Sequence, residues 1–181
     1  VPPELPSLCA VDQRSVELSG AGDGQSVGLA NYGDETMAIW SYEAGEADST
    51  ALVQSGTFDL STAQFSVTTP FPDSLLSEGT NIAAKGTIFG AAWLEVNGQW
   101  DPSCDEVNPS QCKKDVAFTT FEQGVPSSPP VRVSNSGEAV GRASLAPVAD
   151  GWLVVWSEGG AAYKSTIYGA VVGSDGMAGD P

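Results

Sequence analysis

The chain has 181 residues, of which 21 are glycine and 12 are proline, and only 17% are charged. This composition is typical of a turn-rich all-β protein and disfavours a helical or disordered chain. Seven basic residues stand against 23 acidic ones, for a formal net charge of −16, which excludes binding to nucleic-acid backbones or anionic membrane surfaces.

Residues 1–13 are rich in proline and predict an irregular N-terminal arm. From residue 14 to residue 181 we expect a single domain of three similar units. Their approximate limits are residues 14–59, 64–124 and 131–176.

Each unit has the same order of predicted strands. A short strand (SVELS, FSVTT or VRVSN) is followed by an alanine-containing strand, then by a strand that ends in tryptophan, and then by a long closing strand. The three tryptophans are Trp40, Trp93 and Trp156, and we expect their flat indoles to fill the core between sheets. Four strands in roughly 40–60 residues is the repeat length of propeller blades. We therefore predict an all-β fold of three four-stranded antiparallel, blade-like repeats of a β-propeller, with a β-sandwich as the alternative.

The third unit carries the most distinctive motifs, WLVVW at Trp152–Trp156 and TIYG at Thr166–Gly169, followed by Ser174-Asp175-Gly176. These motifs resemble the blade repeat of large secreted bacterial β-propeller proteins, in which a GYLVVW strand precedes DIYGxRVDxDG. The first two units share the alternation, the tryptophan and the spacing. The resemblance implies a secreted or surface protein of unassigned activity.

Two of the three cysteines, Cys104 and Cys112, bracket seven residues of a polar loop. The chain has no histidine and no CxxC motif, so a disulfide is a better interpretation than a metal site. Such a bond contributes on the order of 2–3 kcal/mol and indicates an oxidising compartment. We therefore expect an extracellular, cell-surface or periplasmic location. Cys9 is then either free or bonded to something outside this chain.

The same loop holds the candidate ligand-binding residues. Asp101, Asp105, Glu106 and Asn108 offer oxygen atoms of the kind that Ca²⁺ prefers, although their spacing matches no D-x-[DN]-x-[DN]-G loop. We expect no cofactor, with calcium as the alternative. Trp100 is a candidate platform for stacking against a sugar, and packing over the disulfide is the simpler interpretation.

Catalytic signals are few. The absence of histidine excludes Ser-His-Asp and Cys-His systems. Glycosidases need only two carboxylates, so they remain the enzyme class that the residues leave open. We expect that the protein is not an enzyme. The predicted function is a secreted or cell-surface, non-catalytic structural or adhesive module in a larger assembly; the alternative is a carbohydrate- or calcium-binding module.

The phase of the repeat predicts a partner. The third unit ends on its third strand, TIYGAVV, while the first unit begins with a spare short strand, SVELS. Open sheet edges favour pairing with another strand. We therefore expect the chain to pair with itself or with another protein through these edges. No apolar run approaches the 18–20 residues needed to span a membrane.

Overall fold

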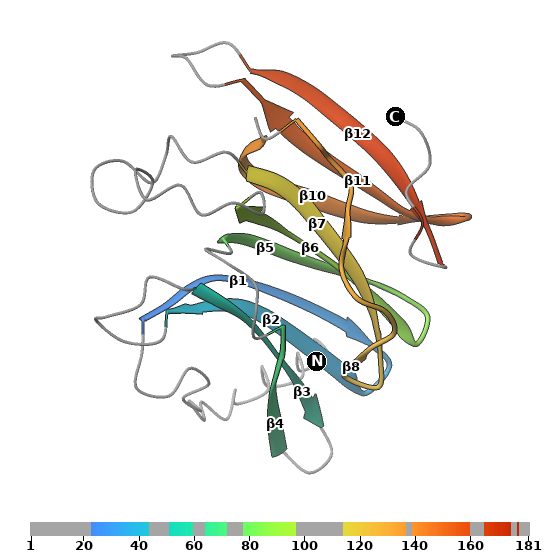
Figure 1. The fold of residues 1–181 in the computed structure, drawn as a ribbon. Coiled ribbons are helices and arrows are strands. Elements are labelled where there is room, and N and C mark those ends of the chain that lie inside the picture. Colours follow the sequence, from blue (N-terminus) through green and yellow to red (C-terminus); the bar gives the residue numbers. More distant parts are fainter. Residues whose placement is uncertain are drawn as a thin grey trace, which may run out of the picture.

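The computed structural model describes residues 23–43, 51–59, 64–71, 78–96, 114–136, 139–159, 165–174 and 177. Every regular element among them is a β-strand, and all strand pairs are antiparallel (Figure 1). The prediction of an all-β, antiparallel protein is confirmed. No helix in the described part of the chain is long and apolar enough to cross a membrane.

The strands form three sheets. The first sheet has the order β1 (Asp23–Tyr32), β2 (Glu35–Glu43), β3 (Ala51–Asp59) and β4 (Gln64–Phe71). The second has β5 (Glu78–Lys85), β6 (Ile88–Val96) and β7 (Lys114–Glu122), with β8 (Val125–Pro126) and β9 (Val131–Arg132) both paired to β7. The third has β10 (Ala139–Val148), β11 (Gly151–Glu158) and β12 (Thr166–Gly173). Four strands per sheet, as predicted, hold for the first sheet alone: the second has five and the third has three.

The first two strands of each sheet form a tight hairpin. The β1–β2 turn is Gly33-Asp34, between the paired residues Tyr32 and Glu35, and Gly33 has a φ of +60°. A two-residue turn of this hand needs positive φ, which glycine adopts without strain. The expected hairpin with Gly33-Asp34 at its turn is therefore confirmed, and so is the β11–β12 strand pair in the third unit.

The first strand of each sheet has an irregularity opposite the repeated tryptophan or next to its register partner. The register shifts fall between Gln25 and Val27 in β1, between Glu78 and Asn81 in β5, and between Val140 and Ser144 in β10. Bulges of this kind bend a strand and increase its twist. The recurrence shows that the three sheets repeat one local design.

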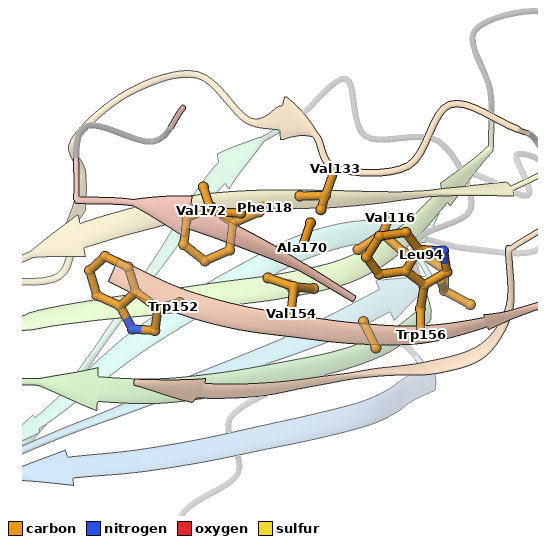
Figure 2. Packing of buried hydrophobic residues seen from close by; sticks show 11 residues of the cluster. Leu94, Val116, Phe118, Val133, Trp152, Val154, Trp156, Ala170 and Val172 are labelled. Carbon is orange, nitrogen blue, oxygen red and sulfur yellow. The ribbon is translucent and has the colours of Figure 1, made fainter. Parts of the chain in front are cut away.

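The sheets are stacked, with the second between the first and the third (Figure 1). Side chains that alternate along β6 point to opposite neighbours, so that Ala91 and Trp93 face the first sheet while Ala92 and Leu94 face the third. The core between the first and second sheets consists of Met37, Ile39, Val53, Ile82, Phe89, Ala91, Trp93, Ala117 and Phe121. The core between the second and third sheets is shown in Figure 2 and includes Leu94, Val116, Phe118, Trp152, Val154 and Trp156.

The short predicted strands belong to different sheets than their order suggested. FSVTT lies in β4 and pairs with β3, and Val131–Arg132 of VRVSN pairs with β7. Each short strand therefore adds to the sheet that precedes it, instead of opening the next one. The corresponding segment SVELS lies outside the described residues.

Candidate functional site

The site residues predicted from the sequence fall in the connection between β6 and β7. Trp100, Asp101, Cys104, Asp105, Glu106, Asn108 and Cys112 all lie outside the described residues. Within the residues that are described, no group of three or more histidine, cysteine, aspartate or glutamate side chains is arranged to hold a metal ion. The functional groups that the structure does place are therefore different ones.

A carboxylate cluster, formed by Glu95, Asp115 and Arg132, lies where this connection meets the second sheet. Glu95 on β6 and Asp115 on β7 are directly opposite each other in the strand register. Arg132 Nη1 lies 3.8 Å from Asp115 Oδ2. Asp115 is only 1% exposed, whereas Arg132 is exposed and Glu95 is half-buried.

Burial raises the pKa of the Glu95 carboxyl above its ordinary value of 4.5. The Trp93 indole and the Arg132 guanidinium act in the opposite direction, and the nearby Asp115 carboxylate raises the pKa further. Trp93 Nε1 has no partner in hydrogen-bonding geometry among the described residues, so its effect is that of a nearby polar contact. The cluster thus places the Glu95 carboxyl, whose pKa is raised by burial, opposite Asp115, whose Oδ2 faces the Arg132 guanidinium.

Hydrogen bonds through Ser134 fix Asp115 in place. The Ser134 hydroxyl accepts a 2.8 Å bond from the backbone N–H of Val116 and lies 3.3 Å from Asp115 Oδ1, to which it donates. The backbone N–H of Val133 donates to the carbonyl of Val116. These contacts attach the segment that follows β9 to β7. Asp115 therefore has a structural role in joining two segments of the second sheet.

A second group lies at the corresponding position of the third sheet. Trp156 on β11 and Tyr168 on β12 are register partners, and their rings stack with centroids 6.2 Å apart and planes 21° apart. The buried Trp156 donates from Nε1 to Glu158 Oε1 at 2.8 Å. Tyr168 is 41% exposed, and Glu158 is half-buried. We call Trp156, Tyr168 and Glu158 the aromatic group.

The two groups share a sequence pattern that our reading of the sequence missed. Trp93-x-Glu95 and Trp156-x-Glu158 place a tryptophan and a glutamate on one face of the strand, two residues apart. Glu95 lies near the C-terminal end of β6 and Glu158 at the C-terminal end of β11, and these two strand ends lie on the same side of the molecule (Figure 1). The repeated W-x-E was visible in the printed sequence. An exposed aromatic ring beside a carboxylate can pack against a flat apolar surface and accept hydrogen bonds from hydroxyl groups.

No protein-family model matches the sequence, and no curated protein matches it. Among solved structures, the chain is similar to a Trypanosoma rangeli sialidase in complex with 2,3-difluorosialic acid. The TM-score is 0.47 at 11% identity, covering 74% of this chain and 26% of the sialidase. It is also similar to a GH43 endo-arabinanase from Bacillus licheniformis, with a TM-score of 0.34 at 10% identity, covering 89% and 79% of the two chains. The chain thus spans about a quarter of the sialidase that it matches.

This comparison corrects the functional prediction. We predicted a non-catalytic structural or adhesive module, whereas the similar structures are a sialidase and GH43 proteins. The prediction is therefore wrong. The findings agree better with its alternative, a carbohydrate- or calcium-binding module. They also leave glycosidase activity open, as the sequence did. TM-scores below 0.5 do not establish a shared fold.

Proposed function

We propose that this chain is a carbohydrate-binding unit of a propeller-type protein, and that its three sheets are blades. The aromatic group carries this proposal. Tyr168 presents an exposed ring that is backed by the buried Trp156, and the Glu158 carboxylate is held beside it by the Trp156 indole. Sugar rings have an apolar face of C–H groups and a rim of hydroxyls, and these match a fixed aromatic surface with an adjacent acceptor.

The aromatic group is rigid, which favours binding. Tyr168 is fixed by its stacking on Trp156, and Glu158 loses little freedom on binding because its Oε1 already accepts a bond. A surface that is ordered before binding loses less entropy when the ligand arrives. Oε2 of Glu158 then remains to accept a hydrogen bond from a sugar hydroxyl.

The carboxylate cluster supplies polar groups of the same chemistry at the second sheet. The Arg132 guanidinium can donate several hydrogen bonds, and the half-buried Glu95 carboxyl, whose pKa is raised by burial, offers oxygen atoms beside it. Asp115 is almost completely buried and is fixed by Ser134 and Arg132. This arrangement supports binding over hydrolysis, because the second carboxylate of a glycosidase must reach the sugar or its attacking water.

A glycan array tests the proposal. We expect the wild-type chain to bind one class of oligosaccharides on the array, and we expect the Tyr168→Ala variant to lose that binding. Tyr32→Ala is the matched control, because Tyr32 is also an exposed tyrosine but lies at the β1–β2 turn. Absence of any wild-type signal, or equal signals from the two variants, would contradict the proposal.

Calcium binding by Asp101, Asp105, Glu106 and Asn108 stays a prediction, as does the disulfide between Cys104 and Cys112. An extracellular, cell-surface or periplasmic location belongs to the same proposal, because it rests on that disulfide. Thermal melting with and without Ca²⁺ tests the metal site. Binding raises the midpoint temperature of unfolding, and an unchanged midpoint would contradict calcium binding.

A further inference from the structure

The chain holds one of its own ammonium groups against an indole ring. Lys85 Nζ lies 5.8 Å from the centroid of the Trp152 ring. The same nitrogen donates a 2.7 Å hydrogen bond to the carbonyl oxygen of Ala149. The face of an aromatic ring attracts a cation, and the oxygen accepts one of the ammonium protons. An aromatic ring beside an oxygen acceptor is therefore a pairing with which this protein already holds an amine.

The aromatic group has the same two components at the other end of β11. Trp152 is the second residue of this strand and Glu158 is its last. Tyr168, which is 41% exposed, supplies the ring. The Glu158 carboxylate, which accepts the 2.8 Å bond from Trp156 Nε1, supplies the oxygen atoms. A carboxylate attracts an ammonium more strongly than a backbone carbonyl does, because the carboxylate carries a negative charge.

The strand register brings this ring and this carboxylate within reach of one ligand. Tyr168 pairs with Trp156, and Glu158 pairs with Thr166, so Glu158 and Tyr168 are diagonal neighbours on one face of the third sheet. Diagonal neighbours are close enough for aromatic and long side chains to meet. Among the described residues, neither a lysine nor an arginine forms an ion pair with Glu158. A small cation can therefore contact the ring and the carboxylate together.

The charge of the chain favours a cationic ligand over an anionic one. Its formal net charge is −16, and Glu158 places one of these negative charges at the aromatic group itself. A surface of one sign attracts ligands of the opposite sign and repels those of its own sign. Glycans with carboxylate or sulfate groups are therefore disfavoured at this position, and glycans with amino groups are favoured.

We propose that the aromatic group binds amino sugars, with the sugar ammonium between the Tyr168 ring and Glu158 Oε2. This inference rests on the proposed carbohydrate binding and names its ligand class, sugars that carry a free amino group. The ammonium donates a hydrogen bond to Oε2 and lies over part of the Tyr168 ring. The neighbouring C–H groups of the sugar cover the rest of that ring.

Calorimetric titration with three matched tetrasaccharides tests the proposal. Chitosan tetramer, chitin tetramer and cellotetraose have the same backbone and carry an ammonium, an acetamide or a hydroxyl at the second carbon of each sugar. The titrations are run at about pH 6, where amines are protonated. We expect the wild type to bind chitosan tetramer about tenfold more tightly than cellotetraose. Added salt should reduce this difference, because salt screens exposed charges.

Glu158→Gln should lower the affinity for chitosan tetramer to that for cellotetraose. Glutamine keeps an oxygen that accepts a bond from the Trp156 indole, so the substitution removes the charge and leaves the aromatic surface in place. Glu122→Gln is the matched control, because it removes one charge at an exposed site of the second sheet. This control should keep the preference for the amine.

The outcomes separate this inference from the proposed function. Equal wild-type affinities for chitosan tetramer and cellotetraose would overturn the amine preference and leave carbohydrate binding in place. A preference that survives Glu158→Gln, or that Glu122→Gln abolishes equally, would also overturn the inference, because the ammonium would then not be held by Glu158. Tighter binding of chitin tetramer, or binding of none of the three, would overturn it too, and the glycan array would then decide the proposed function alone.

Discussion

The indole of Trp152 lies directly against the backbone of Gly90, across the interface between the second and third sheets. A β-carbon added to Gly90 would be 2.6 Å from Trp152 Nε1 and 2.8 Å from two carbons of the indole. Trp152 is fully buried, and Lys85 Nζ lies 5.8 Å from the centroid of its ring. The close approach of the two sheets at this point therefore depends on the absence of a side chain at residue 90.

We predict that Gly90→Ala destabilises the protein by about 1–3 kcal/mol, because the indole must move within a packed core. Chemical denaturation monitored by tryptophan fluorescence measures the change. Gly169→Ala is the control: its β-carbon would meet its nearest atom at 3.5 Å, an ordinary contact. Equal stabilities for the two variants would show that the interface tolerates the added carbon.

Removing the Ser134 hydroxyl should also destabilise the protein. Ser134→Ala leaves the buried N–H of Val116 without its 2.8 Å acceptor and removes a donor to Asp115. An unsatisfied buried donor costs about 1–3 kcal/mol. Ser127→Ala, at an exposed position of the same segment, should change the free energy of unfolding far less. The prediction fails if the two alanine variants unfold at the same denaturant concentration.

Glu95 gives the stability a specific pH dependence. Because burial raises the pKa of Glu95 in the folded chain, the folded state holds this proton more tightly than the unfolded state. This contribution therefore favours folding at low pH, and it is lost as the pH rises from about 4.5 through the raised folded pKa.

Glu95→Gln removes this titration. The stability of the wild type relative to Glu95→Gln should therefore fall with rising pH across that interval and level off above it. Unfolding curves at several pH values measure the difference, with Glu122→Gln at an exposed site as the control. A wild-type advantage that grows with pH would contradict the burial of Glu95.

The sequence predicted the local elements well because they depend on local chemistry. Alternation and the Gly33-Asp34 turn predicted the first hairpin, and the tryptophan spacing predicted buried indoles at Trp93 and Trp156. Alternation tells which side chains share a face, but not which sheet covers that face. For this reason alternation did not predict that Trp152, which is not one of the three repeated tryptophans, is a central core residue, nor that its indole packs against Gly90.

Sheet membership and the candidate site were harder to predict. FSVTT has the same alternation whether it opens one sheet or completes another, and only the register of Phe58 with Phe65 settles that it completes the first. Glu95 and Glu158 were two among 23 acidic residues. The burial of Glu95 and the hydrogen bond from Trp156 to Glu158 distinguish these two glutamates, and both features depend on tertiary packing.

The most direct test of carbohydrate binding is a calorimetric titration of the best array glycan into Tyr168→Phe and Tyr168→Leu. Phenylalanine keeps the aromatic face and its stacking on Trp156, whereas leucine keeps apolar volume without the ring. We predict that Tyr168→Phe binds nearly as well as the wild type. We predict that Tyr168→Leu loses about tenfold in affinity, which corresponds to about 1.4 kcal/mol. Equal affinities for the two variants would contradict a binding surface built on the Tyr168 ring.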